Sequence, residues 1–257
     1  MSDSKTVLEL RKVDKSFGLI DALHDINLSI REGEVLCLLG DNGAGKSTLM
    51  KTISGLNPAS KGEILFQGKP VKFNTPRDAR DLGIEMVYQD LALAGNLPIA
   101  QNIYLGREPT KRFGLINRID HKRCLEMSQE HLDKLKIHVK SAKQKVEELS
   151  GGQRQAVAIA RATAFDANLV IMDEPTAALA VKEVSKVLDL IKRLKSLNVA
   201  VIIISHRMDD IFAVCDRVMA LFHGRNFAED SIKDTSHDEL IGWIMGTTQN
   251  KNGSRNE

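Results

Sequence analysis

Cysteine, aromatic residues and long hydrophobic runs are all scarce in this chain of 257 residues. The cysteines, Cys37, Cys124 and Cys215, lie far apart with no CxxC pair, and their odd number argues against a disulfide framework. The longest apolar runs, such as residues 199–204, are too short to cross a bilayer, and the first ten residues lack the pattern of a secretory signal. We therefore expect a soluble chain in a reducing cytoplasm.

An excess of one charge is also missing, because 36 Lys and Arg residues stand against 34 Asp and Glu residues. Dedicated nucleic-acid binders usually concentrate Lys and Arg on one face, so we expect no nucleic-acid partner. The one modest basic run is KRFGLINRIDHKR at residues 111–123. We interpret it as a charged face of a helical region.

The hydrophobic pattern predicts two kinds of β-sheet. Alternating apolar and polar residues, typical of a half-exposed antiparallel sheet, occur at 6–12, 20–30 and 62–73, the last with a central Gln-Gly turn. Nearly continuous apolar runs, typical of parallel strands buried on both faces, occur at 34–40, 169–174 and 199–205. Ligands of open α/β sheets bind at the carboxyl ends of such strands.

The long interval between the first two buried strands indicates an insertion. It exceeds what one crossover needs, and residues 120–165 are rich in helix formers, so we expect an inserted helical subdomain. Residues 182–197 predict a further helix whose core face holds Val184, Val187, Leu188, Ile191 and Leu194. Residues 247–257 are polar and are expected to form a disordered tail.

The segment GDNGAGKST matches the phosphate-loop pattern G-x-x-x-x-G-K-[ST] between a buried strand and a helical segment. Its glycines allow backbone N–H groups to surround phosphate oxygens, while Lys46 neutralises the β and γ groups and the Ser47 hydroxyl binds Mg²⁺. We therefore predict that ATP is bound by Gly40, Asp41, Asn42, Gly43, Ala44, Gly45, Lys46, Ser47 and Thr48.

A second group of candidate site residues follows the apolar strand in LVIMDEP. Asp173 at the strand tip is placed to hold the magnesium shell. Glu174 comes next, and a second carboxylate there suits a hydrolase that must orient a water molecule against the γ-phosphate.

Together with three further motifs, these segments resemble the ATP-binding cassette (ABC) ATPases, the nucleotide-binding subunits of ABC transporters. The resemblance covers about residues 5–245, and the further motifs are MVYQD with Gln89, LSGGQ at 149–153, and IIISHRM with His206. It implies a P-loop NTPase (RecA-like) α/β core over 5–246, with an N-terminal antiparallel β subdomain and a helical insertion at roughly 91–164.

The resemblance also assigns roles to single residues. Gln89 would contact Mg²⁺ and the attacking water while its loop touches a membrane partner, and His206 would contact the γ-phosphate. Phe17, in DKSFG, would stack on adenine. Two cassettes would pair head to tail, as a homodimer in the simplest case, so that one binds the partner's ATP through Ser150, Gly151, Gly152 and Gln153.

One residue departs from the family pattern. After Leu179 the family's D-loop usually carries Asp, whereas this chain has Ala180. The usual contact of that carboxylate across the dimer cannot form, which leaves Lys46, Asp173 and Glu174 untouched. We expect hydrolysis to survive.

Residues 83–108 and the segment DEPTAAL are similar to bacterial importers of monosaccharides of the ribose, xylose and fructose class. This similarity implies a separate cassette, peripheral to the cytoplasmic face of the plasma membrane. It would dock on a transmembrane permease served by a periplasmic or extracellular sugar-binding protein. Two alternatives stay open: an importer cassette for another solute, and a soluble ABC ATPase that acts on nucleic acid or ribosomes.

Overall fold

The structure, a computed structural model, describes residues 5–113 and 116–247. The predicted tail, except Thr247, lies outside these ranges. The strands are β1 (Thr6–Phe17), β2 (Ile20–Arg31), β3 (Val35–Leu39), β4 (Lys61–Phe66), β5 (Lys69–Val71), β6 (Ile84–Val87), β7 (Thr110–Phe113), β8 (Ile116–Ile119), β9 (Leu169–Asp173), β10 (Ala200–Ile204), β11 (Arg217–Phe222) and β12 (Arg225–Ser231). The helices are α1 (Lys46–Ile53), α2 (Pro76–Asp81), α3 (Ile99–Tyr104), α4 (His121–Lys134), η1 (Val146–Glu148), α5 (Gly151–Thr163), α6 (Val181–Ser196), α7 (Met208–Val214), η2 (Ile232–Asp234) and α8 (His237–Met245).

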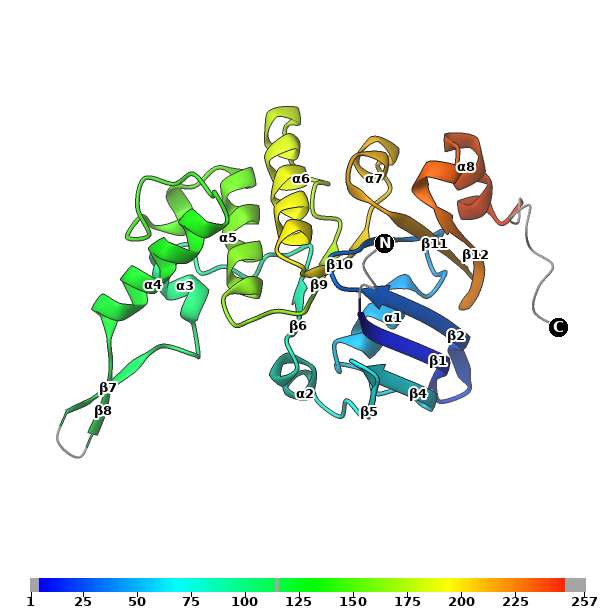
Figure 1. The fold of residues 1–257 in the computed structure, drawn as a ribbon, viewed down its shortest axis with the longest axis horizontal. Coiled ribbons are helices and arrows are strands. Elements are labelled where there is room, and N and C mark those ends of the chain that lie inside the picture. Colours follow the sequence, from blue (N-terminus) through cyan, green and yellow to red (C-terminus); the bar gives the residue numbers. More distant parts are fainter. Residues whose placement is uncertain (1–4, 114–115, 248–257) are drawn as a thin grey trace.

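A six-stranded sheet in the order β12-β11-β3-β10-β9-β6 forms the centre of the fold (Figure 1). The five strands from β11 to β6 pair in parallel, and β12 pairs antiparallel with β11. In β3, Leu36 and Leu38 pack into one hydrophobic core, whereas Val35, Cys37 and Leu39 pack into another. The prediction of strands buried on both faces is confirmed.

The first core lies between this sheet, α1 and a second, antiparallel sheet in the order β2-β1-β4-β5. The three alternating segments supply these four strands, as predicted. The Gln-Gly turn lies between β4 and β5, and both of its residues have positive φ, 49° at Gln67 and 77° at Gly68. Positive φ at both central residues suits the right-handed twist of a two-residue hairpin.

The second core covers the opposite face of the six-stranded sheet, where α6, α7 and α8 lie (Figure 1). The predicted helix at 182–197 corresponds to α6, and four of its five predicted core residues are buried. Leu188 is partly buried and packs against the same core, and Leu190, which the prediction did not include, is buried as well. The core stripe is therefore centred closer to Leu190 than the pattern indicated.

Helices α3, α4 and α5 stand together at one end of the molecule (Figure 1). Their side chains share the second core with the sheet, and the boundaries 91–164 of an inserted subdomain stay a prediction. Residues 111–123, expected to be a charged face of the helical subdomain, lie within its proposed bounds but are mostly not helical. Strands β7 and β8 form an antiparallel hairpin here, and only the segment from His121 onward is helical.

Candidate active site

A cavity of about 590 Å³ opens at the carboxyl ends of the parallel strands. Ten of the predicted site residues line it: Asn42, Gly43, Gly45, Lys46, Ser47, Thr48, Gln89, Asp173, Glu174 and His206. They come from the carboxyl ends of β3, β6, β9 and β10 and the segments just after them, which include the first turn of α1. The structure therefore brings together four of the five motifs found in the sequence.

The phosphate loop turns sharply between β3 and α1. Gly40 has a φ of 139°, and a Cβ atom there would lie 2.4 Å from the carbonyl oxygen of Leu221, so only glycine fits. Gly43 has a φ of 82°, and a Cβ atom built on it meets no other atom within 4 Å. The loop is thus packed against the protein at its base and open toward the cavity, as phosphate binding requires.

Lys46 lies at the first position of α1 and is 8% exposed. Its ammonium group donates hydrogen bonds to the carbonyl oxygens of Gly40 at 2.6 Å and Asp41 at 2.9 Å. Burial lowers the pKa of Lys46, while the negative charges of Glu174, Asp41 and Asp173 act in the opposite direction. A buried cation surrounded by acids and carbonyl groups is available for phosphate oxygens.

Two neighbouring carboxylates face this lysine from the end of β9. Burial raises the pKa of both Asp173 and Glu174, and the charge of Lys46 opposes the shift at each. Glu174 has a φ of 49°, a conformation that non-glycine residues rarely adopt. Its backbone N–H donates to the carbonyl of Ile204 at 3.0 Å, which ties this turn to the end of β10. Strained backbone held by surrounding structure is common at functional sites.

His206 completes this cluster from the loop after β10. Its Nε2 atom lies 3.1 Å from Oε1 of Glu174, and the histidine side chain is 51% exposed whereas the glutamate side chain is 14% exposed. Oε1 of Glu174 is nevertheless buried without a well-aligned hydrogen bond among the described residues. This carboxylate oxygen is therefore available to accept a hydrogen bond from a water molecule in the cavity.

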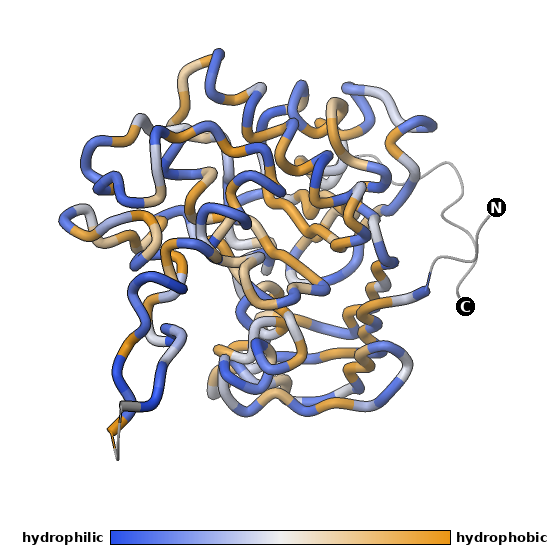
Figure 2. Tube along the Cα trace, turned by 60° about the vertical axis from the view of Figure 1, so that its left-hand side comes forward, coloured by the Kyte–Doolittle hydropathy of each residue, from blue (hydrophilic) through white to orange (hydrophobic). Residues whose placement is uncertain are grey.

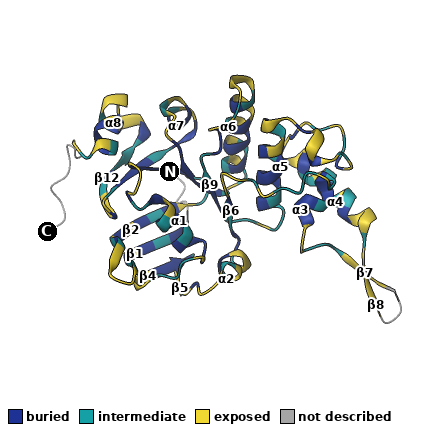
Figure 3. Cartoon of the chain, turned by 180° about the vertical axis from the view of Figure 1, so that it is seen from behind, coloured by how far each residue is buried: buried dark blue, intermediate teal, exposed yellow. Residues whose placement is uncertain are grey.

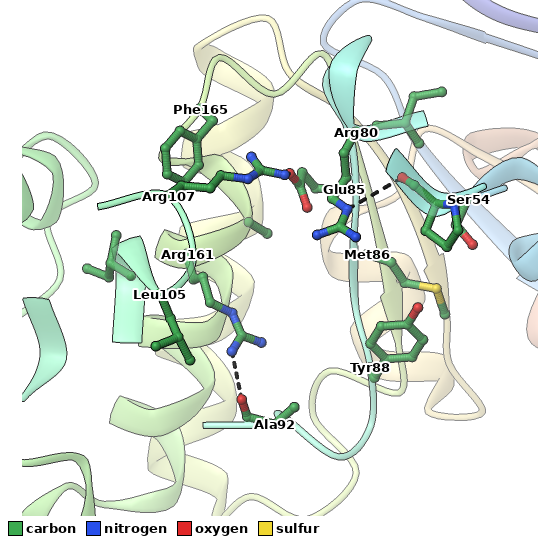
Figure 4. Close-up of a pocket in the computed structure, with 14 residues that line it drawn as sticks. Ser54, Arg80, Glu85, Met86, Tyr88, Ala92, Leu105, Arg107, Arg161 and Phe165 are labelled. Carbon is green, nitrogen blue, oxygen red and sulfur yellow. Dashed lines mark hydrogen bonds and ion pairs between the residues drawn. The ribbon is translucent and has the colours of Figure 1, made fainter. Parts of the chain in front are cut away.

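Gln89 is exposed and borders the same cavity, and the loop that follows it is fixed by a residue that the sequence did not reveal. Arg161, near the end of α5, donates to the carbonyl oxygens of Leu91 and Ala92, each at 2.7 Å, and Figure 4 shows the bond to Ala92. Burial lowers the pKa of Arg161, and the charge of Glu85 opposes that shift. The Gln89 loop is thereby connected to the helix that begins with the LSGGQ motif.

Apart from the LSGGQ residues, four of the predicted nucleotide-binding residues do not line the cavity: Phe17, Gly40, Asp41 and Ala44. The last three form the base of the phosphate loop, where Ala44 donates its N–H to the carbonyl of Asp41. Phe17 is 47% exposed at the end of β1, with the Lys15 ammonium 4.9 Å from its ring centre. Its strand partner Ile20 does line the cavity, so the ring lies beside the site.

The LSGGQ segment lies apart from this cavity and opens α5. Ser150 caps the helix, and its side chain and that of Gln153 form a reciprocal capping box, which satisfies two backbone N–H groups. The Glu183 carboxylate accepts hydrogen bonds from the Ser150 hydroxyl and the Gly152 N–H, and these bonds lower its pKa. Within one chain, then, the start of α5 is bound to α6.

Sequence reasoning missed six residues that line the cavity: Ile20, Asp21, Ala22, Ile204, His223 and Gly224. His223 and Gly224 have φ values of 47° and 73° in the turn between β11 and β12. Gly224 donates its N–H to the carbonyl of Ala44 and accepts a bond from His24. The dipeptide His-Gly after an apolar strand signals a turn, but nothing in the sequence places that turn beside the phosphate loop.

Comparison with known proteins identifies this arrangement. Residues 23–177 match the model of the ABC transporter family. The chain is 48% identical over 240 residues to the xylose/arabinose import ATP-binding protein XylG of Sulfolobus acidocaldarius, and the match covers 93% of each protein. The chain belongs to the ABC transporter family.

One further relative and one solved structure are also similar to this ABC cassette. It is 40% identical to the ribose import ATP-binding protein RbsA 2 of Streptomyces avermitilis, where the match covers 93% of this chain but 47% of that protein. It also matches the dimeric structure of the cassette MJ0796 bound to ADP and Pi, with a TM-score of 0.70 and 28% identity over 89% of this chain and 100% of that one.

These findings confirm the predicted α/β fold of the ABC ATPases and the predicted enzyme class. The family binds nucleotide and hydrolyses ATP, so this chain is an ATPase. None of the helices within residues 5–113 and 116–247 is long and apolar enough to cross a membrane.

We predict that Gly152→Ala destabilises the cassette. The added Cβ atom would lie 2.7 Å from Cβ and 3.1 Å from Cγ of Glu183, which is closer than packed atoms approach. Overpacking of this kind costs about 1–3 kcal/mol. The free energy of unfolding in urea measures the effect.

Gly151→Ala is the matched control, because its Cβ atom would meet only side-chain atoms at 3.3 Å or more. Alanine also favours helix over glycine by up to about 1 kcal/mol, so this variant should be neutral or more stable than the parent. Equal stability of the two variants would refute the packing explanation for Gly152.

Proposed function

We propose that this ABC ATPase is the ATP-hydrolysing subunit of an importer for a monosaccharide. The observation that carries the proposal is the convergence of Lys46, Asp173 and Glu174 in one cavity of a chain that matches XylG over almost its full length. The proteins XylG and RbsA 2 are named for the import of xylose or arabinose and of ribose, which supports a sugar as the solute.

Glu174 is the residue we propose to orient the attacking water. Its carboxylate faces the cavity 3.1 Å from His206, and its raised pKa makes it a better proton acceptor than an ordinary glutamate. Lys46 would neutralise the phosphate oxygens, and His206 and Gln89 would help to fix the water and the γ-phosphate. These side chains come from four separate loops, so their positions depend on the sheet beneath them.

The residues proposed to hold Mg²⁺ fit that ion. Ser47, Gln89 and Asp173 line the cavity together and offer hydroxyl, amide and carboxylate oxygens, the hard donors that Mg²⁺ prefers. Few protein ligands are needed, because Mg²⁺ usually keeps several waters and takes further oxygens from phosphates. The ion would neutralise charge on the β- and γ-phosphates.

The complete site is proposed to form between two copies of the chain. The residues of the LSGGQ segment, Ser150, Gly151, Gly152 and Gln153, lie outside the cavity that holds Lys46 within one cassette. The family includes a dimeric cassette bound to ADP and Pi, which supports a dimer in which these residues bind the partner's ATP. Phe17 would stack on adenine at the edge of the cavity.

A second cavity, of about 290 Å³, is the proposed contact for the transmembrane permease (Figure 4). It lies beyond the Gln89 loop and is bordered by Tyr88 and Ala92 of that loop and by Leu105 after α3. Tyr88 and Leu105 are 40% and 53% exposed, which leaves apolar surface for a partner. Binding there would place the cassette at the cytoplasmic face of the membrane, with an external sugar-binding protein delivering the solute.

We also propose limits for the ATPase domain and for its helical insertion. The ATPase domain would span residues 5–246, and the insertion at roughly 91–164 would carry α3, α4 and α5 as one body. Arg161 of α5 binds the carbonyl groups of Leu91 and Ala92 at the start of this insertion, and Glu183 of α6 binds the start of α5.

For Glu174→Gln we expect ATP binding near the parental affinity and a turnover rate reduced at least about 100-fold, the range for loss of a general base. The amide keeps the size of the side chain but cannot accept the proton from water. Steady-state ATPase assays and equilibrium binding of ATP measure the two effects. Hydrolysis near the parental rate would remove Glu174 from this role.

A mixing experiment tests the dimer. Lys46→Ala disables the phosphate loop and Ser150→Arg disables the LSGGQ segment, so neither variant alone should associate in the presence of ATP. A mixture of the two has one complete composite site and should form a mixed dimer. Ser185→Arg, at an exposed serine of α6, is the control for the added arginine. Association no greater than the sum of the separate variants would rule out the composite site.

The transported solute is tested in liposomes. The cassette and the permease that co-purifies with it are reconstituted, and ATPase rates are compared with candidate sugar-binding proteins loaded with ribose, xylose, arabinose or fructose. We expect one sugar to raise the rate. Retention of ribosomes or DNA, with no permease, would instead support a soluble ABC ATPase.

A further inference from the structure

The hairpin of β7 and β8 stands out from the body of the cassette (Figures 1 and 3). The side chains of residues 110–112 and 116–119 in this hairpin are exposed. It is held at its base, where Asp120 donates its N–H to the carbonyl of Pro109 at 2.7 Å. Isolated two-stranded hairpins are marginally stable in water, so strands whose described side chains are all exposed call for another role.

A local excess of positive charge lies in and beside this hairpin. Residues 110–123 contain five Lys and Arg residues and one Asp, a net charge of +4, whereas the whole chain carries +2. All the other residues together therefore carry −2. Lys111 and Lys122 are exposed, and their ion pairs with Asp120 at 3.7 Å and Glu126 at 3.8 Å are long. Exposed pairs of this kind neutralise little charge.

Apolar side chains accompany these charges. Ile116 is 60% exposed and Ile119 is 42% exposed, both on β8. Figure 2 shows the hairpin as a mainly hydrophilic projection with hydrophobic positions toward its end. Basic residues combined with exposed aliphatic ones are typical of segments that bind at a membrane surface.

The hairpin also begins at the rim of the cavity proposed for the permease. Leu105 and Arg107 line that cavity, and β7 starts three residues after Arg107. A cassette bound to a permease through this cavity would hold the hairpin close to the bilayer. This step rests on the proposed function.

We propose that the β7–β8 hairpin and the start of α4 bind anionic phospholipid headgroups beside the permease. The negative potential of a cytoplasmic leaflet attracts Lys and Arg within about a Debye length. The permease itself is a poorer match, because cytoplasmic loops of membrane proteins carry an excess of Lys and Arg and would repel the hairpin. Lys111 and Lys122 supply charge to this surface, and Ile116 and Ile119 enter the headgroup layer.

Vesicle sedimentation with the full chain, without any permease, tests the proposal. The parent should bind vesicles that contain phosphatidylglycerol, bind pure phosphatidylcholine vesicles weakly, and dissociate from the former as salt is added. Lys111→Gln combined with Lys122→Gln should weaken binding to the anionic vesicles by about 25-fold, since each charge near such a surface contributes about fivefold. ATPase activity should be unchanged.

Lys192→Gln combined with Lys233→Gln is the matched control, because it removes the same charge from exposed lysines on α6 and η2. This control should bind as the parent does. Equal loss in both double variants, absence of a preference for anionic vesicles, or binding of single-stranded DNA without binding of vesicles would overturn the proposal.

Co-purification with the permease in detergent separates this proposal from the proposed function. The Lys111 and Lys122 variant should retain the permease there, because no bilayer is present. If the parent also fails to retain a permease, the importer assignment fails, whereas the vesicle result still decides the role of the hairpin.

Discussion

The parallel hydrogen bonding of β10 with β3 and β9 is the constraint on which the ATPase site depends. In this register Ile204 is level with Asp173 on one side and with Leu38 on the other. The chain leaves all three strands at the same edge, so the phosphate loop, the acid pair and His206 emerge together. Apolar side chains on both faces of the strands hold the register, because a shift by one residue would exchange the two cores.

That geometry also brings one cationic and two acidic side chains together in the cavity. Burial disfavours the charged forms of Lys46, Asp173 and Glu174 alike. The charge of Lys46 offsets part of this penalty at both carboxylates and they offset part of it at Lys46, whereas the charge of Asp173 adds to the penalty at Glu174. Removal of Lys46 would leave two buried carboxylates less compensated, so the lysine proposed to bind phosphate also stabilises the glutamate proposed to orient water.

The sequence predicted the parts of the fold that have a strong local signal. Continuous apolar runs and a phosphate-loop pattern located β3, β9, β10 and Lys46. Contacts distant in sequence left no such signal: Arg161 binds carbonyl groups about 70 residues away, and His223 reaches the cavity because β11 pairs with β3. The β7–β8 hairpin was missed because its strands have four residues each, too few for the alternation to stand out among basic residues that also suit a helix.

Packing within one chain requires a glycine in the LSGGQ segment. Gly152 is proposed to bind the partner's phosphate, but it also lies against Cβ of Glu183, so glycine is required there even in a single cassette. The Glu183 carboxylate also accepts the N–H of Ala180, the position where the family's usual Asp would cap α6. Glu183 is the third residue of α6, and its carboxylate accepts the N–H of Ala180 itself while also binding the start of α5. Ala180 has no side chain that could accept the N–H groups of the first turn, so α6 begins with this one side-chain hydrogen bond and without a side-chain cap.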